Sequence, residues 1–430
     1  MSTTAIVLII AGLVISGAVG YYLMPTKTVE KIITTTKSPL QDLTIPLGMI
    51  AASDTDFETY KPLMDKITTV DINNYLKILG YNTKIIINQD SAVGQAQIHL
   101  EKIQSFHSQG TNLVIGGSWS SLAQASLSYV NSNNMLLVSP GSTSPTLAIA
   151  NDNLYRLAVC DVNAAPAIAE MISSWPIKAV IFIQRGDTWA DGIYAMVAPE
   201  LTKRNVEIID RIRYTTESTE FANYLTLMDG KVATAIAKYG ASHVGVMTSS
   251  FDEIVTIITQ AQDFSNLKQI IWFGHESAGR NPRVVADAPI QGVQFRLFST
   301  NLAPTKSHLW NDLMDRLFTL TKYVGGGGHA ASYDAAWIIT KSVLEGGSAD
   351  PLVVKAVLPG VAKNYFGAMG WEELDANGDL KPSSYDIWGY GKTADGTVAF
   401  MSFGTYNFVT GVMSWNDGLL NAQGTTRPAG

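Results

Sequence analysis

The sequence predicts an α/β protein of two lobes, each built on a parallel β-sheet with helices on both faces, with a transmembrane helix ahead of them. Three observations predict this fold. From Leu43 onward, short apolar runs alternate with stretches that have helical periodicity. The alternation occurs twice, from about residue 44 to 158 and again from about residue 176 to 298. Ahead of both, the segment Ala5–Met24 contains no charged residue.

The amino-terminal apolar segment is long enough to cross a bilayer, which takes about 20 residues of helix. Tyr21 and Tyr22 stand at its end, where amphipathic rings prefer the membrane interface. A cleavable secretory signal is the rival interpretation, since Ala18-Val19-Gly20 has the small residues of a cleavage site. A buried helix of a soluble protein is the third. The first two interpretations both export the rest of the chain, although the lysines after the segment would favour the opposite orientation.

Composition also predicts the roles of the segments before and after the two lobes. Residues 1–24 form the signal peptide or membrane anchor, and residues 25–43 are rich in Thr and Lys, with two prolines, which is typical of a spacer. Residues 421–430 lack core-forming side chains and are expected to be a frayed tail.

Composition limits the classes of function. Hydrophobic residues make up 46% of the chain and charged residues 16%, which excludes a mainly disordered protein. The net charge of -7 should repel phosphate backbones, so no nucleic-acid partner is expected. The single cysteine, Cys160, excludes an intramolecular disulfide and a multi-thiolate metal site.

Within the lobes, nine apolar runs are predicted to be strands. Such continuous runs indicate strands buried on both faces, and right-handed strand–helix–strand units make the sheets parallel and the lobes Rossmann-like. In the first predicted helix, Tyr60, Met64 and Ile67 share one face, and Gly80 ends it. The nine runs are Ile45–Ala51, Thr83–Ile87, Leu113–Ile115, Met135–Val138, Lys178–Ile183, Val206–Ile212, His243–Met247, Gln269–Phe273 and Gly292–Leu297.

Polar turns follow these strands, and ligands of open parallel sheets bind at the carboxyl ends of the strands. Hydroxyls and glycines beside helix N-termini can donate to an anion. A lone carboxylate, Glu276, can face a cation, so the turns predict a site for a small zwitterion. The alternative is that each turn is an ordinary helix cap. The turns are Ser53–Thr55, Gly117–Ser121, Ser139–Thr143, Arg185–Trp189, Thr248–Phe251 and Gly274–Ser277.

Catalytic motifs are missing from the sequence. Gly325–Gly328 lacks the Gly-Lys-Ser/Thr of a phosphate-binding loop, and no G-x-S-x-G motif occurs. The six histidines lack zinc-site spacing, and His99 and His107 are expected on a solvated helix face. Asp375–Asp379 lacks the last ligand of a calcium loop and is predicted to be a turn between strands. We therefore expect no enzyme activity, no catalytic residue, no cofactor and no metal site.

Four segments carry a family resemblance, and the most specific is V-S-P-G-S-T-S-P at Val138–Pro145. The others are Tyr155-Arg156 followed by Asp161, the S-Y-D-A-A of Ser332–Ala336, and Gly370–Asp379 followed by Tyr385–Trp388. With these motifs, the chain from about Ile45 to about Tyr390 resembles the type I periplasmic binding proteins. The specific likeness is to the branched-chain amino-acid and amide branch (Leu/Ile/Val-binding-like), which captures ligands for ABC importers.

The resemblance implies a set of ligand-binding residues. Ser120 matches the serine that contacts the ligand carboxylate, and Gly141, Ser142 and Thr143 match the groups that hold the carboxylate and amine. Glu276 matches the acidic residue that receives the ammonium. The remaining three form the side-chain pocket: Phe57 stands where the family has an aromatic residue, while Trp189 replaces a usual tyrosine and Ser250, with Phe251, occupies a turn where tyrosine is common. The specificity wall is therefore expected to differ from that of the family.

The resemblance also implies how the lobes work. A three-strand hinge, with crossovers near 157–161, 297–302 and 363–368, lets the lobes close on a solute. Lobe 1 is expected to comprise residues 44–158 plus 299–363, and lobe 2 residues 159–298 plus 364–420.

The expected function is that of an extracytoplasmic solute-binding protein. It would capture a small amino acid or amide, a small polar or zwitterionic solute, and deliver it to ABC permease subunits. We expect a monomer on the extracellular face of the cell membrane, either secreted or anchored through its N-terminal helix, because no lipobox cysteine is present. The alternatives left open are a ligand-binding sensor or receptor domain with a signalling partner, an adhesion or structural protein, and a hydrolase.

Overall fold

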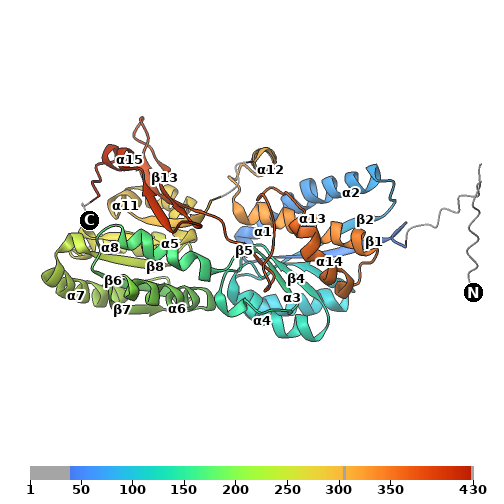
Figure 1. The fold of residues 1–430 in the computed structure, drawn as a ribbon, viewed down its shortest axis with the longest axis horizontal. Coiled ribbons are helices and arrows are strands. Elements are labelled where there is room, and N and C mark those ends of the chain that lie inside the picture. The colour runs from blue at the N-terminus through green and yellow to red at the C-terminus, as the bar shows by residue number, and fades with distance from the viewer. Residues whose placement is uncertain (1–38, 304–306, 428–430) are drawn as a thin grey trace, which may run out of the picture. The chain divides into compact units, whose positions relative to one another are not determined.

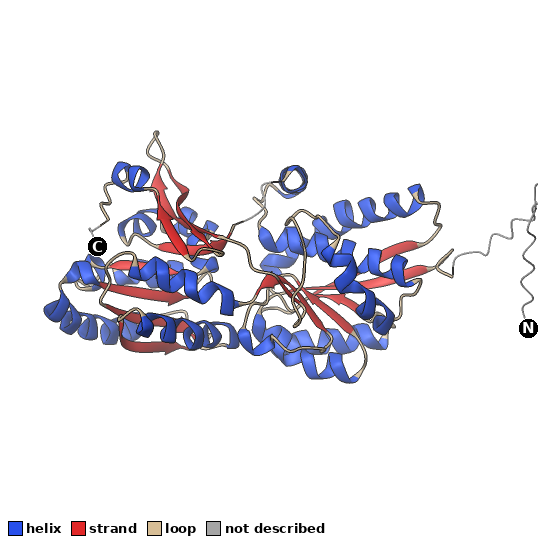
Figure 2. Cartoon of the chain, viewed as in Figure 1, coloured by secondary structure: helices blue, strands red, loops and turns tan. Residues whose placement is uncertain are grey.

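The computed structural model describes residues 39–303 and 307–427, and its strands form two sheets. The six-stranded sheet has the order β11-β5-β4-β3-β1-β2, and the eight-stranded sheet has the order β14-β13-β12-β10-β9-β8-β6-β7. We call residues 39–159 with 308–380 lobe 1 and residues 160–302 with 385–427 lobe 2, according to the sheet that each part joins (Figure 1). Helices cover the strands in both lobes (Figure 2).

All strands of the lobe 1 sheet run parallel. They are β1 (Thr44–Ala51), β2 (Lys84–Ser91), β3 (Leu113–Ile115), β4 (Leu136–Ser139), β5 (Leu154–Val159) and β11 (Asp379–Leu380). The α-helices are α1 (Asp54–Pro62), α2 (Thr69–Ile78), α3 (Ala96–Ser108), α4 (Ser120–Ser132), α12 (His308–Thr321), α13 (Gly327–Gly346) and α14 (Pro351–Lys363). A π-helical turn (Leu63–Thr68) joins α1 to α2, and a 3₁₀ turn (Pro145–Leu147) follows β4.

The lobe 2 sheet mixes parallel and antiparallel strands. Its parallel strands are β6 (Ala179–Arg185), β7 (Glu207–Tyr214), β8 (Val244–Ser249), β9 (Ile271–Gly274) and β10 (Phe298–Leu302), and β12 (Tyr385–Lys392), β13 (Val398–Asn407) and β14 (Val412–Trp415) add antiparallel ones. The helices are α5 (Asp161–Ser173), α6 (Thr188–Lys203), α7 (Ala222–Tyr239), α8 (Ile254–Ala261), α9 (Glu276–Gly279), α10 (Pro282–Asp287), α11 (Pro289–Gln294) and α15 (Asp417–Ala422), with 3₁₀ turns at Ala241–His243 and Leu267–Gln269.

The apolar runs are continuous because each sheet has a core on both faces. In β1, Leu47 belongs to the core on one face and Ile50 to the core on the other. In β6, Phe182 and Ile183 divide in the same way between the two cores of lobe 2. All the predicted runs except the last coincide with strands, so the predicted two-lobed α/β architecture is confirmed.

The first helical segment also follows the prediction. Tyr60, Met64 and Ile67 are all buried, and Gly80 after the helix has a φ of +85°, a conformation that favours glycine. The Ser53 side chain caps α1 by accepting from the N–H of Asp56 at 3.1 Å.

Two expectations about lobe 2 are wrong. The run Gly292–Leu297, predicted as a strand, is the end of α11 and the turn after it, and the strand begins at Phe298. Pro289 occupies the first turn of this short helix, and a Cβ on Gly292 would lie 2.9 Å from the Tyr390 ring, so the glycine permits close packing. The sheet is not wholly parallel, since the C-terminal hairpins add three antiparallel strands.

The chain passes between the lobes three times, after β5, after β10 and between β11 and β12. The first passage falls inside the expected range 157–161. The third differs from the expected 363–368, because Asp379 of β11 still pairs with Arg156 of lobe 1 and the passage lies at residues 381–384. Strand β10, expected largely in lobe 1, joins the lobe 2 sheet by pairing with β9.

No helix within the described ranges is long and apolar enough to span a membrane. The predicted transmembrane segment Ala5–Met24 lies outside these ranges, as does most of the predicted spacer, and both remain predictions.

Candidate functional site

Turns from both lobes line a cavity of about 250 Å³ at the carboxyl ends of the parallel strands. Lobe 1 contributes Ser118, Trp119, Ser120, Gly141 and Thr143, and lobe 2 contributes Trp189, Phe251, Glu276 and Ser277. Trp119, Phe251, Glu276 and Ser277 also line a wider cavity of about 610 Å³, which makes the two cavities neighbours. This is the place where the sequence predicted a ligand.

In the lobe 1 wall, the hydroxyl of Ser120 organises the turn after β4. Its oxygen accepts from the backbone N–H groups of Thr143 at 3.3 Å and Ser144 at 3.2 Å, and from the hydroxyl of Ser142 at 3.3 Å. All three contacts use Ser120 as acceptor, so its own O–H remains a donor for an acceptor atom in the cavity.

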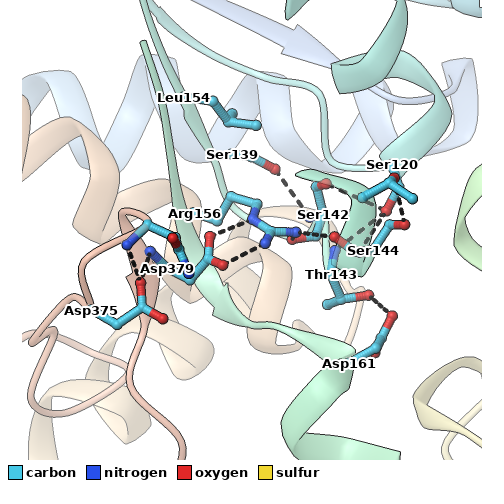
Figure 3. Close-up of polar contacts among 12 residues, drawn as sticks. Ser120, Ser139, Ser142, Thr143, Ser144, Leu154, Arg156, Asp161, Asp375 and Asp379 are labelled. Carbon is cyan, nitrogen blue, oxygen red and sulfur yellow. Dashed lines mark hydrogen bonds and ion pairs between the residues drawn. The ribbon is translucent and has the colours of Figure 1, made fainter. Parts of the chain in front are cut away.

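The same turn is held from behind by Arg156 of β5 (Figure 3). One guanidinium nitrogen donates to the carbonyl of Ser144 at 2.8 Å and to that of Ser142 at 3.3 Å. The other two nitrogens donate to the two carboxylate oxygens of Asp379, each at 2.5 Å. Arg156 and Asp379 are almost fully buried, so this ion pair fixes the turn from inside lobe 1.

His99 of α3 supports the neighbouring turn after β3. Its Nε2 accepts from the N–H of Gly117 at 2.9 Å, and its Nδ1 lies 2.7 Å from the hydroxyl of Ser126. The expectation of a solvated face is therefore wrong for His99, whose side chain is fully buried. Burial lowers the pKa of His99 to about 3, so the ring is neutral and can act as an acceptor.

In the lobe 2 wall, Glu276 begins α9 directly after β9. No hydrogen bond from a side chain reaches its carboxylate within residues 39–303 and 307–427, and Arg280, four residues on, forms no ion pair with it. Burial raises the pKa of the Glu276 carboxyl and nearby Asp161 raises it further, while His275 and a backbone hydrogen bond from Leu302 oppose this. The carboxylate is thus available to a cation in the cavity.

A chain of hydrogen bonds connects the two walls beside this cavity. Thr143 donates its hydroxyl to Asp161 at 2.8 Å, and the other carboxylate oxygen of Asp161 lies 3.0 Å from Nε2 of His275. Nδ1 of His275 lies 3.0 Å from the hydroxyl of Thr300. Burial lowers the pKa of His275, but Asp161 and Glu276 outweigh this and raise it overall.

Aromatic rings form the remaining wall. Trp189 stacks on Phe251 with ring centroids 4.8 Å apart, and Trp119 from lobe 1 lies 5.0 Å from the same Phe251. The guanidinium of Arg185 lies 4.3 Å from the centroid of Phe251 and pairs with Asp187 and Glu253. The Trp119–Phe251 contact therefore joins the lobes across the cavity.

Five of the eight predicted ligand-binding residues line this cavity: Ser120, Gly141, Thr143, Trp189 and Glu276. Ser142 and Ser250 are buried behind it, where the hydroxyl of Ser250 bonds that of Thr248 at 2.6 Å. Phe57, on α1, lines none of the cavities described here. The prediction did not include Trp119 or Ser277, although both stand in turns that directly follow strands.

Comparison with known proteins gives two kinds of match. Residues 67–393 match the family model described as the receptor family ligand binding region. A protein of Methanocaldococcus jannaschii, carrying the name uncharacterized protein MJ1266, is 24% identical over 404 residues, which is 89% of this chain and 94% of that protein.

Solved structures share the fold. The leucine-binding protein LivK of Thermotoga maritima has a TM-score of 0.64 and 14% identity, covering 87% of this chain and 99% of its own. A second structure is that of LivJ of Streptococcus pneumoniae, a branched-chain amino acid transporter substrate-binding protein solved with isoleucine. It has a TM-score of 0.66 and 15% identity, and the match covers 84% of this chain and 99% of LivJ. At 14% and 15% identity, these two structures show that the fold is shared.

Proposed function

We propose that the chain is an extracytoplasmic solute-binding protein that captures a small amino acid or amide between its lobes. It belongs to the family described as the receptor family ligand binding region. It hands this solute to the permease subunits of an ABC importer. LivK and LivJ, which share its fold, are solute-binding proteins, and this favours the transport role over an enzymatic one.

One observation carries the proposal. One small cavity presents the hydroxyl donor of Ser120 on the lobe 1 side and the Glu276 carboxylate on the lobe 2 side, and no side chain of residues 39–303 or 307–427 is hydrogen-bonded to that carboxylate. A donor set opposite a carboxylate is complementary to a carboxylate and an ammonium on one small molecule. In this role Ser120, Gly141 and Thr143 hold the anionic end, Glu276 holds the ammonium, and Trp189 faces the ligand side chain.

The remaining predicted residues act indirectly in this proposal. Ser142 and Ser250 hold their turns in place, and other residues of the same turns reach the ligand. Phe57 contacts the ligand only if the lobes move further together.

Binding would work by closing the cleft. Three chain passages join the lobes, and a ligand that touches both walls favours the closed arrangement over the open one. Closure would also remove the ammonium and the Glu276 carboxylate from water, so their pairing then decides affinity.

The protein would act on the extracellular face of the membrane, as a monomer, held by its N-terminal apolar segment or released after cleavage. A second candidate, a sensor that presents the same ligand to a signalling partner, uses the same cavity. The two differ only in the partner that the closed form recognises.

A thermal-shift screen of amino acids, amides and urea tests the proposal. At least one zwitterionic amino acid or amide should raise the melting temperature in a concentration-dependent way, because a ligand that binds only the native state stabilises it. If none does at millimolar concentration, the proposed ligand class is wrong. Co-purification of the liganded protein with ABC permease subunits would then separate import from sensing.

A further inference from the structure

Arg280 follows α9 and lies in the wall of two cavities next to Glu276. It lines the 610 Å³ cavity and, with Gly141, Thr143 and Glu276, a third cavity of about 230 Å³. Glu276 lines all three cavities, so Arg280 stands beside the proposed ligand site rather than apart from it.

The guanidinium of Arg280 lacks an anionic partner. Within the described parts of the chain, it forms no ion pair within 4.0 Å, and its buried Nε has no hydrogen-bond partner. Its contact is with the face of Trp388 on β12, at 4.6 Å from the ring centroid. Burial lowers the pKa of Arg280, and the charge of Asp386 opposes this only in part. A half-buried cation in this state favours an anion from outside the chain.

The other cation of these cavities already has charged partners, and three of the carboxylates accept hydrogen bonds from neutral side chains. Arg185 is held by Asp187 and Glu253, as described above. Asp252 accepts from the side chain of Asn281 at 3.0 Å, and Asp56 accepts from the hydroxyl of Ser53 at 2.9 Å. Glu217, at the exposed rim, accepts from the hydroxyl of Thr216 at 2.6 Å.

Three groups of the site therefore lack a side-chain hydrogen bond or ion pair of the required kind among the described residues: the Ser120 hydroxyl as a donor, the Glu276 carboxylate, which accepts only from the backbone of Leu302, and the Arg280 guanidinium. A simple α-amino acid satisfies the first two and leaves the third unpaired. We propose that Arg280 is a specificity-determining residue and that the ligand is an amino acid with a second carboxylate on its side chain. This inference rests on the proposed function, since it assumes that the α-carboxylate and ammonium bind at Ser120 and Glu276.

In this arrangement the first part of the ligand side chain lies beside Trp189 in the small cavity, and its second carboxylate extends past Glu276 toward Arg280. A guanidinium can donate two parallel hydrogen bonds to a carboxylate, and the amide of a neutral isostere cannot accept both. The site therefore distinguishes an acidic amino acid from its amide by charge and by hydrogen bonding, at equal size.

The test is calorimetric titration of the full-length protein with L-glutamate, L-aspartate, L-glutamine, L-leucine and L-lysine. The better of the two acidic amino acids should bind at least ~30-fold more tightly than glutamine, because leaving one member of a buried charge pair unmatched costs about 2 kcal/mol or more. Tighter binding of glutamine, leucine or lysine overturns the inference. Preference for lysine would mean that Asp56 and Asp252 set the selectivity instead.

Variants then assign the preference to Arg280. Arg280→Met should weaken the acidic ligand by at least ~30-fold and glutamine by less than about threefold. Arg283→Met, three residues on at an exposed pair with Asp287, is the matched control and should change neither affinity. Equal weakening of all ligands by Arg280→Met would indicate a structural role at Trp388 and overturn the inference.

If Arg280→Met does not fold, the acid-to-amide ratio of the wild-type protein and the Arg280→Lys variant decide. Lysine keeps the positive charge but lacks the planar guanidinium that donates two parallel hydrogen bonds. Arg280→Lys should therefore bind acidic amino acids with an intermediate affinity. Binding of neutral amino acids alone contradicts this inference and leaves the proposed function standing. Binding of no amino acid contradicts the proposed function itself.

Discussion

Arg156 and Asp379 form a buried, two-pronged ion pair between residues 223 positions apart in the sequence, with both nitrogen–oxygen distances at 2.5 Å. Arg156 stands on β5, the last strand before the chain first leaves lobe 1, and Asp379 on β11, the last strand before it finally leaves. The pair thus ties two of the three passages together and, through the carbonyls of Ser142 and Ser144, the cavity-lining turn after β4 as well.

Removing one member of this pair should be costly. Asp379→Asn leaves the Arg156 charge buried without its counter-charge, and we expect a loss of about 3–5 kcal/mol in unfolding free energy, measured by urea denaturation. Lys381→Met removes the exposed Lys381–Glu373 pair two residues away and should cost less than about 1 kcal/mol. Equal losses in the two variants would contradict the role assigned to the buried pair.

His99 predicts a dependence of stability on pH. The pKa of His99 is about 3 in the folded protein, against an ordinary value of 6.5 in the unfolded chain. Between these two pH values the unfolded chain therefore binds one more proton than the folded protein. The neutral ring therefore contributes stability at neutral pH that is lost as the pH falls below about 6.5, with a slope of up to about 1.4 kcal/mol per pH unit.

The measurement is urea denaturation at pH 7, 6 and 5. His99→Gln keeps an acceptor for the Gly117 N–H but cannot titrate, so its stability should fall less steeply than that of the wild type. His107→Gln, at a half-buried position on the same helix, controls for the loss of a histidine. A wild-type slope equal to that of His99→Gln would mean that the His99 ring does not titrate as described.

The aromatic contact between lobes predicts a loss of affinity without a loss of folding. Trp119→Ala removes the ring that meets Phe251 across the cavity, a contact worth about 0.5–1.5 kcal/mol beyond its buried area. Ligand affinity should fall by about tenfold or less, with the melting temperature of the free protein nearly unchanged. Trp371→Ala, at a mostly exposed lobe 1 position, is the control and should leave affinity unchanged.

The two lobes should fold without the amino-terminal apolar segment. A protein that begins at Pro39 retains every strand and helix of the structure, and we expect a soluble monomer by size-exclusion chromatography with light scattering. Persistent association with membranes after high-salt washing would contradict this expectation.

The architecture was accessible from the sequence because strands buried on two faces leave a simple pattern. Apolar residues that alternate between two cores read as one unbroken run, as in Phe182 and Ile183. Gly292–Leu297 has the same composition but ends a helix, since close packing against Tyr390 depends on tertiary contacts that composition does not encode.

The site divides in a similar way. That Glu276 and Ser120 line one cavity was predictable, because parallel strands bring their carboxyl ends to one edge, which places the following turns together. The residues behind these turns could not be predicted in this way. His99 reaches the Gly117 turn from a helix, and the lack of an ion pair at Arg280 within the described residues depends on the distances of many neighbours. The third chain passage was misplaced because Asp379 is fixed by a partner on a distant strand.

The central claim is that Glu276 is the counter-charge for the ammonium of a ligand bound between the lobes. Calorimetric titration of wild type and Glu276→Gln with the best ligand of the thermal-shift screen tests it most directly, with Glu373→Gln, an exposed carboxylate, as control. Glu276→Gln keeps the size and removes the charge, so affinity should fall by a few hundred- to a few thousand-fold, about 3–5 kcal/mol, while the control binds as the wild type does. Affinities of wild type and Glu276→Gln within about threefold, ~0.65 kcal/mol, would contradict the claim.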